Sequence, residues 1–169
     1  MRQSLEELSA AFGRLSDERE IERIILSYGH VIDFGSPADY AALFTEDGVV
    51  EVRSAFFQVL GLDIGIPKPL MELMVSRGAE PTPDGMAFKG EAALKAFVTR
   101  PPRTARSLHV TSQPLVRLLD ADTAEAKSYL RIYSHAPQAQ PQLVGFGRYL
   151  DEFRRTASGW RIRQRVIEM

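Results

Sequence analysis

The run from Thr123 to Tyr133 contains no glycine or proline and alternates two kinds of side chain. Because successive residues of a strand point to opposite faces, this pattern predicts a long strand with one face toward a core. The predicted inner face is small and apolar, and the outer face is charged and aromatic. The inner residues are Ala124, Ala126, Ser128, Leu130 and Ile132, and the outer ones are Glu125, Lys127, Tyr129, Arg131 and Tyr133. Such a strand requires covering elements on its inner face.

Further strands are predicted on both sides of this one, and helices precede them. The expected strands cover residues 49–52, 107–119 around Pro114, 143–154 and 160–167, with a loop longer than two residues between the last two. Helices in the first part and antiparallel strands in the second favour an α+β fold, with the helices on one face of a curved sheet. At 169 residues the chain is expected to form a single domain, 1–169.

Capping signals predict where the helices begin. Ser4 with Glu7 and Asp17 with Glu20 are capping-box patterns, which predict a short helix followed by a second one ending near Ile32. Ser36 and Pro37 open a third helix that reaches Phe44, and Asp39 is interpreted as its cap. A short helix is also expected over 90–98. The stretch 54–87, rich in proline and glycine, is interpreted as an irregular insertion that is either a lid on a pocket or part of a subunit interface.

Charge and composition exclude several classes of function. The chain has 21 basic and 22 acidic residues and a net charge of −1, so neither nucleic acid nor an anionic membrane is expected as a partner. The absence of cysteine excludes disulfides and thiolate chemistry. Three histidines without paired spacing do not predict a metal site. No signal-like or membrane-spanning run is present, which makes the cytoplasm the default location.

The end of the second predicted helix carries polar groups on an apolar stripe. Tyr28 follows Ile21, Ile24 and Ile25 at helical spacing, and Asp33 ends the helix just before Gly35. Tyr28 and Asp33 are therefore candidates to face a pocket. Two plainer interpretations stay open: Tyr28 as a core residue with its hydroxyl bonded to backbone, and Asp33 as a helix-end cap. His30 lies roughly 200° around the helix from Tyr28 and is expected to point elsewhere.

The order of several short motifs resembles the SnoaL-like branch of the nuclear transport factor 2-like superfamily, which includes scytalone dehydratase. The motifs are Tyr28 to Asp33, Ala41 to Gly48, Phe88 to Leu94, Leu108 to Thr111, Gly147 to Phe153 and Gly159 to Ile162. The resemblance implies a cone-shaped, curved mixed or antiparallel sheet wrapped around N-terminal helices, an α+β barrel or cystatin-like roll with an internal apolar cavity. The family's common signature is His-His-Val-Thr-Asn-Pro. The corresponding residues of this chain are Leu108-His109-Val110-Thr111-Ser112-Gln113-Pro114, so one histidine and the asparagine are missing.

The resemblance also implies the site residues. The aspartate and histidine of the dehydratase-type members correspond to Asp33 and His109. A pocket tyrosine of some members corresponds to Tyr28, and an arginine of another relative, the hexachlorocyclohexane dehydrochlorinase, corresponds to Arg165. Arg148, Tyr149 and Phe44 complete the expected substrate-binding set. A second interpretation of Arg165 comes from strand alternation. Every second residue of the last strand is an arginine, which is typical of a solvated strand face: Arg161, Arg163 and Arg165 alternate with Trp160, Ile162 and Gln164. His135 is expected to be solvated.

A histidine–aspartate dyad removes and returns protons without a metal or cofactor. The expected function is therefore a cofactor-independent lyase or isomerase of dehydratase, dehydrohalogenase or cyclase type. Its substrate is expected to be small, mainly apolar and cyclic, with Tyr28 donating to the developing oxyanion. The alternative is a non-catalytic ligand-binding or dimerisation module of the same fold. The outer face with Tyr129, Arg131 and Tyr133 suits a homo-oligomer, either a dimer or a trimer.

Overall fold

The computed structural model describes residues 4–53, 68–99, 106–135 and 140–169 of the chain. Helices alternate with strands in the first part, and strands alone make up the second. The helices are α1 (Leu5–Phe34), α2 (Pro37–Ala41), α4 (Lys68–Ser76) and α5 (Gly90–Val98); the strands are β1 (Phe44–Arg53), β2 (Glu80–Thr82), β3 (Gly85–Lys89), β4 (Arg106–Leu118), β5 (Thr123–His135), β6 (Gln142–Thr156) and β7 (Gly159–Glu168). This arrangement confirms the α+β prediction.

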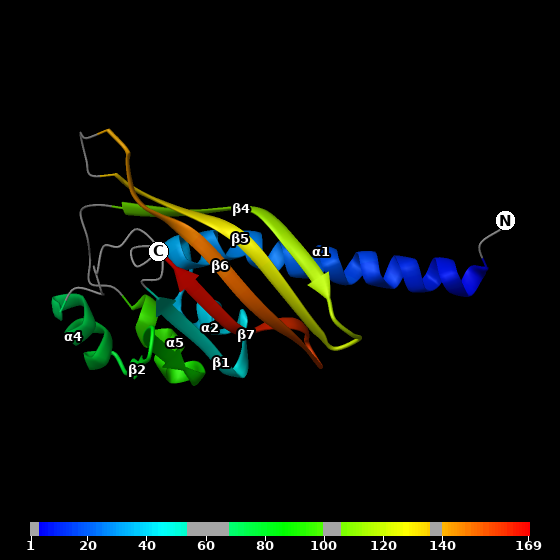
Figure 1. Ribbon diagram of the computed structural model, residues 1–169, viewed down its shortest axis with the longest axis horizontal. Helices are drawn as coiled ribbons and strands as arrows, with labels where there is room; N and C mark the ends of the chain where they lie inside the picture. The colour runs from blue at the N-terminus through cyan, green and yellow to red at the C-terminus, as the bar shows by residue number, and fades with distance from the viewer. Residues whose placement is uncertain (1–3, 54–67, 100–105, 136–139) are drawn as a thin grey trace.

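The strands form one seven-stranded mixed sheet in the order β2-β3-β1-β7-β6-β5-β4. Strands β1 and β7 are parallel, and all the other neighbours are antiparallel. The long strands β4, β5 and β6 cross the C-terminal half of α1, while α4 and α5 lie near the β1–β3 end (Figure 1). Among the described residues β2 and β4 are edge strands, so the sheet is open.

Alternation in β5 follows the sequence pattern. Ala124, Ala126, Ser128 and Leu130 are at most 4% exposed, whereas Tyr129 is 57% exposed. The inner face packs against α1, whose buried residues include Ile21, Ile25, Tyr28 and Ile32. The two-faced strand was therefore predicted correctly, because burial on one side imposes a period of two.

Helix α1 is a single helix of 30 residues, not the two successive helices that the capping patterns predicted. Ser4 and Glu7 do form a capping box. Asp17 and Glu20, by contrast, bond to β7: the Trp160 indole N–H donates to Asp17 Oδ1 (3.1 Å) and the Trp160 backbone N–H donates to Glu20 Oε1 (2.9 Å). No proline interrupts the chain between these boxes, so the helix continues through the second one.

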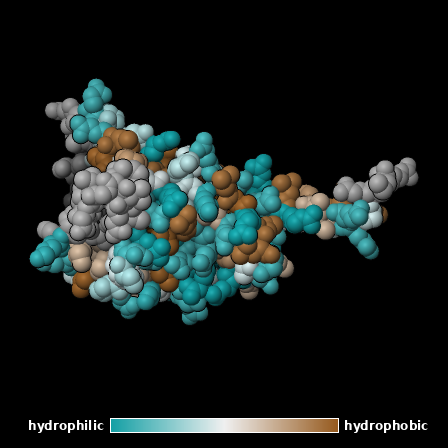
Figure 2. All heavy atoms as spheres, in the orientation of Figure 1, coloured by the Kyte–Doolittle hydropathy of each residue, from teal (hydrophilic) through white to brown (hydrophobic). Residues whose placement is uncertain are grey.

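The N-terminal part of α1 extends beyond the sheet (Figures 1 and 2). It carries exposed apolar side chains, among them Leu5 (85% exposed) and Phe12 (75% exposed). In the described part of the chain, no helix combines the length and the apolar character that crossing a membrane requires.

Helix α2 begins as predicted. Ser36 Oγ accepts from the backbone N–H of Asp39, and Asp39 Oδ2 accepts from the backbone N–H of Ser36, which confirms Asp39 as a cap. The helix ends at Ala41, however, and β1 already begins at Phe44. Residues 45–48, between the predicted helix and the strand predicted over 49–52, instead form an irregular part of β1, where its pairing register with β7 shifts.

Residues 68–87 correct the prediction of an irregular insertion. Helix α4 and strands β2 and β3 occupy most of this segment, and β3 pairs with β1, with Phe88 opposite Val50. Gly78 adopts φ +86° after α4, a left-handed conformation that ends the helix, and Gly85 begins β3 after a turn. Residues 54–67 of the predicted insertion lie outside the described residues.

A bulge in β7 corrects the prediction that Arg161, Arg163 and Arg165 share a solvated face. Glu152 pairs with Gln164 and Phe153 pairs with Ile162, so Arg163 has no opposite residue on β6. One extra residue reverses the side-chain alternation beyond it. Arg165 therefore points inward and is fully buried. The β6–β7 connection is also shorter than predicted, since Ala157 and Ser158 alone separate the two strands, with Gly159 at φ +95°.

Candidate active site

Asp33 and His109 meet where the end of α1 crosses β4. Asp33 Oδ1 lies 2.6 Å from His109 Nδ1, and Asp33 Oδ2 accepts the backbone N–H of His109 at 2.7 Å. The carboxylate is 3% exposed and the imidazole 10% exposed. Because an ionised carboxylate only accepts hydrogen bonds, this contact places a proton on Nδ1, and in the neutral imidazole Nε2 then keeps its lone pair. The predicted contact between these residues is present.

The close approach of α1 and β4 depends on Gly29. A Cβ atom at this position would lie 2.2 Å from the backbone carbonyl oxygen of His109. Only a residue without a side chain lets the helix backbone reach the strand at this point. Gly29 therefore brings Asp33, one turn further along the helix, within bonding distance of His109.

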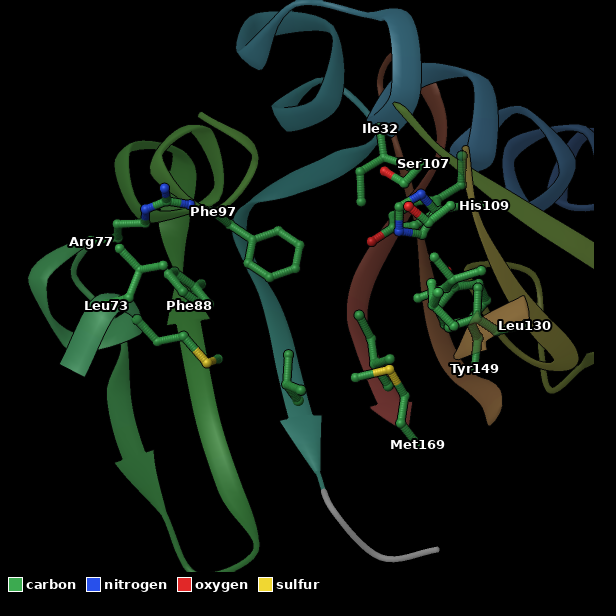
Figure 3. Close-up of a pocket in the computed structure, with 17 residues that line it drawn as sticks. Ile32, Leu73, Arg77, Phe88, Phe97, Ser107, His109, Leu130, Tyr149 and Met169 are labelled. Carbon is green, nitrogen blue, oxygen red and sulfur yellow. The ribbon is translucent and has the colours of Figure 1, made fainter. Parts of the chain in front are cut away.

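A cavity of about 390 Å³ opens beside the dyad. Its size falls within the range of small-molecule sites. Most of the described residues that line it are apolar, and its polar groups are few. The lining includes Ile32, Val52, Leu73, Met74, Phe88, Phe97, Leu130, Ile132 and Ile167, together with the polar residues Tyr28, Arg77, Ser107, His109, Ser134 and Tyr149. His109 and Tyr149 line one side, and Leu73, Arg77 and Phe88 line the facing side (Figure 3).

Tyr28 belongs to a buried cluster of phenols. Its hydroxyl lies 2.8 Å from that of Tyr40, and its ring centroid lies 5.3 Å from that of Tyr149. Burial raises the pKa of Tyr28, although the nearby Arg165 charge opposes this rise. Burial also raises the pKa values of Tyr40 and Tyr149 well above the ordinary value. All three phenols are therefore neutral at physiological pH, and in the pair of Tyr28 and Tyr40 either hydroxyl can be the donor.

A buried ion pair lies behind these rings. Arg165 Nε and Nη2 donate to the two carboxylate oxygens of Asp151 at 2.7 and 2.6 Å, and both side chains are fully buried. Burial alone would lower the pKa of Arg165, but the Asp151 carboxylate outweighs burial and raises it. The guanidinium carbon lies 3.9 Å from the ring centre of Tyr28 and 4.1 Å from that of Tyr149. Such cation–π contacts hold both rings in place.

The structure separates the expected site residues into two groups. Tyr28, His109 and Tyr149 line the cavity, and Asp33 bonds to His109 from behind. The other expected substrate-binding residues are not among the described lining residues. Arg165 lies behind Tyr28 and Tyr149; Arg148 is exposed and paired with Glu168; Phe44 is buried in the core against Tyr40. Direct contact of these three side chains with a ligand stays a prediction, because none of them belongs to the described cavity wall.

Of the remaining histidines, the structure describes the side chain of His30 alone, and it does not join the site. His30 is exposed on α1, as its helical angle predicted. The side chain of His135 lies outside what the structure describes. Within the described residues, no three His, Cys, Asp or Glu side chains gather in a way that would hold a metal ion.

Sequence reasoning missed several residues that shape the site. Tyr40 lies within the third predicted helix, and Asp151 lies within the motif from Gly147 to Phe153, but neither was identified as a site residue. Neither carries a local signal, because the partners of Tyr40 and Asp151 lie 12 and 14 residues away. Arg77 fell in the segment interpreted as irregular. Gly29 itself was the one available signal, because a glycine on the apolar face of a helix indicates close contact with another element.

Comparisons with known proteins agree with the fold. The family model described as a SnoaL-like domain matches residues 13–166. A comparison with curated proteins found no match. Among solved structures, an NTF2-like protein with a cystatin-like fold from Novosphingobium aromaticivorans is 22% identical, with a TM-score of 0.73 over 100% of this chain and 92% of the other.

Two other solved structures share the architecture. A Novosphingobium aromaticivorans protein that carries the name of scytalone dehydratase is 19% identical, with a TM-score of 0.62 over 93% of this chain and 86% of the other. ActVI-ORFA from Streptomyces coelicolor is 17% identical, with a TM-score of 0.64 over 89% of this chain and 94% of the other. At these identities the similarity establishes the fold.

Proposed function

Since this chain belongs to the SnoaL-like domain family, we propose that its cavity is an active site and that the protein is a cofactor-independent lyase or isomerase. The observation that carries the proposal is the contact of 2.6 Å between Asp33 and His109 at the wall of an apolar cavity. The architecture shared with a protein named for scytalone dehydratase is in keeping with elimination chemistry. The substrate class is a small, mainly apolar, cyclic compound.

His109 is the general base in this proposal. With Nδ1 bonded to Asp33, Nε2 is the nitrogen that remains to take a proton from a carbon next to a carbonyl group. The Asp33 carboxylate holds the ring in this tautomer and stabilises the imidazolium that forms. The C–H electron pair moves to the carbonyl oxygen, which becomes an enolate.

Tyr28 is the donor to that enolate oxygen. Its hydroxyl bonds to Tyr40, and when Tyr40 donates in this pair the Tyr28 proton is available to the substrate. A preorganised donor of this kind commonly changes the rate by about 10²–10³-fold. In an elimination, the enolate then expels a β-hydroxyl group, and the imidazolium returns its proton to form water. In an isomerisation, the same proton returns to a different carbon.

The test follows proton abstraction and elimination separately. A panel of cyclic β-hydroxy ketones and their unsaturated analogues is incubated in deuterium oxide. Exchange next to the carbonyl is read by NMR, and enone formation is read by ultraviolet absorbance. His109→Ala is expected to lower both rates by about 10²–10⁴-fold. His30→Ala, which removes an exposed imidazole from α1, is the matched control and should leave both rates unchanged.

Full activity in His109→Ala would contradict the mechanism. Inactivity of the wild-type protein across the whole panel, in both readouts, would favour the alternative of a ligand-binding module with the same cavity.

The outer face of the sheet favours association of the protein with further copies of itself. Val110, Leu115, Tyr129 and Leu143 are 40–72% exposed on β4, β5 and β6, and exposed apolar patches commonly mark interfaces. A dimer or trimer is therefore expected in sedimentation velocity, and Tyr129→Glu should shift it toward the monomer. A monomeric wild-type protein at high micromolar concentration would contradict this expectation.

A further inference from the structure

Arg77 is the only residue with a permanent side-chain charge among the described residues that line the cavity. Its side chain is half-buried. Among the described residues, no carboxylate pairs with it, whereas Arg53, Arg155 and Arg165 all have such partners. Within the described residues, Arg77 is thus a half-buried cation without a carboxylate partner at the wall of a mainly apolar cavity, where an anionic ligand group could pair with it.

The end of α4 fixes the position of Arg77. The backbone N–H of Arg77 donates to the carbonyl of Met74 at 3.1 Å, and the N–H of Ala79 donates to the same carbonyl at 3.0 Å. Gly78, between Arg77 and Ala79, takes the left-handed conformation that ends a helix. Met74 and Ala79 are both buried, so this turn is anchored in the core. The guanidinium therefore extends from a fixed point of the backbone.

The two facing sides of the cavity differ in their charged groups. His109, with the Asp33 carboxylate directly behind it, lines one side, and Arg77 lies on the facing side near Leu73 and Phe88 (Figure 3). An anionic group on a ligand is attracted to Arg77, and when His109 acts as a neutral base the Asp33 carboxylate behind it repels such a group. This polarity orients an asymmetric ligand, with its acidic C–H toward His109 and its anionic group toward Arg77.

We propose that the cavity takes a cyclic substrate bearing a single carboxylate, and that Arg77 binds this carboxylate and determines the orientation of the ring. This inference rests on the proposed function in treating the cavity as the substrate site. A planar guanidinium matches a carboxylate with two parallel hydrogen bonds. A doubly charged phosphate would need more donors than this apolar wall supplies, so a monoanion is the better match. The cavity volume suits a ligand of roughly one or two rings.

The test compares a charged and a neutral probe of the same shape. Binding of 2-naphthoate and 2-naphthamide is measured by isothermal titration calorimetry at low and high salt. The wild-type protein is expected to prefer the carboxylate. Arg77→Met should weaken naphthoate binding about 10- to 100-fold and leave naphthamide binding unchanged. Arg77→Lys keeps the charge but lacks the planar guanidinium with its two parallel donors. Its naphthoate affinity should lie between those of the wild type and Arg77→Met.

Lys68→Met is the matched control, because Lys68 is an exposed cation on α4 that does not belong to the described cavity lining. Its naphthoate affinity should equal that of the wild type. The inference is overturned if Arg77→Met binds naphthoate as well as the wild type does, if the two probes bind equally, or if neither probe binds.

Failure of the proposed function is distinguishable from failure of this inference. His109→Ala should bind naphthoate as the wild type does, since the carboxylate contacts the other side of the cavity. A charge preference that depends on Arg77, in a protein without elimination or exchange activity, would support the inference and reject the catalytic proposal. Activity on ketones that bear a carboxylate, with a KM unaffected by Arg77→Met, would support the catalytic proposal and reject the inference.

Discussion

Gly29 of α1 lies against the backbone of His109 so closely that any side chain at position 29 would overlap the strand. A Cβ atom there would stand 2.2 Å from the carbonyl oxygen of His109. Real Cβ atoms do not approach a backbone oxygen to this distance, so the helix or the strand would have to move. The dyad contact is made four residues further along the same helix, and it depends on this packing.

Gly29→Ala is therefore expected to destabilise the protein by about 1–3 kcal/mol and to lower proton-exchange activity with it. The usual effect of Gly→Ala within a helix is opposite in sign. Gly13→Ala provides the matched control, because a Cβ at Gly13 meets nothing within 4 Å, and it should stabilise α1 by about 0.5–1 kcal/mol. Urea unfolding measures both values. Equal effects of the two substitutions would contradict the role given to Gly29.

Asp33→Asn is expected to reduce the rate of proton abstraction by about 10²–10⁴-fold. The amide has one acceptor oxygen, whereas Asp33 accepts from both His109 Nδ1 and the His109 backbone N–H. One of these donors then faces an N–H₂ group, which favours the wrong tautomer of the imidazole. Deuterium exchange into a ketone measures the effect. Asp39→Asn, which changes a helix cap outside the cavity, should leave the exchange rate at the wild-type value.

The ion pair of Arg165 and Asp151 predicts strongly coupled substitutions. Asp151→Leu or Arg165→Met alone leaves one charge buried without its partner, and each should destabilise the protein by about 3–5 kcal/mol. The double variant Arg165→Met/Asp151→Leu leaves neither charge of this pair in the core. Its free energy of unfolding should therefore fall by far less than the sum of the decreases in the two single variants. A double-mutant cycle in urea unfolding measures this coupling. Additive losses would show that the two side chains do not act as a pair.

The raised pKa values of Tyr28, Tyr40 and Tyr149 predict how stability depends on alkaline pH. Folding keeps these phenols neutral, while the unfolded chain ionises them near pH 10. Their contribution is therefore complete below about pH 10 and is lost as the pH rises above it. The free energy of unfolding should fall through this range, and phenolate absorbance from these residues should appear only as the fold is lost.

Tyr40→Phe serves as the control for this titration. It removes one buried phenol while keeping the ring that contacts Phe44 and Phe97, so the alkaline loss of stability should become shallower. An unchanged slope in Tyr40→Phe would contradict the assignment of Tyr40 to this transition.

Local patterns in the sequence determined much of the fold. The alternation over 123–133, the capping box of Ser4 and Glu7, and the Ser36–Asp39 cap all depend on hydrogen bonds or burial within a few residues, so each could be predicted. The resemblance of the motif order to a known family also predicted the partnership of Asp33 and His109, which are 76 residues apart. Nothing local connects these two residues.

Tertiary structure alone decided the rest of the site. The bulge at Arg163 turns Arg165 inward, and a single extra residue in a strand reverses every later side chain without changing the composition. The pairing of Arg165 with Asp151, the bond between Tyr28 and Tyr40, and the position of Arg77 across the cavity from His109 arise from contacts between separate elements. Periodicity reports which face of an element is buried, whereas the packing of elements decides which buried groups meet.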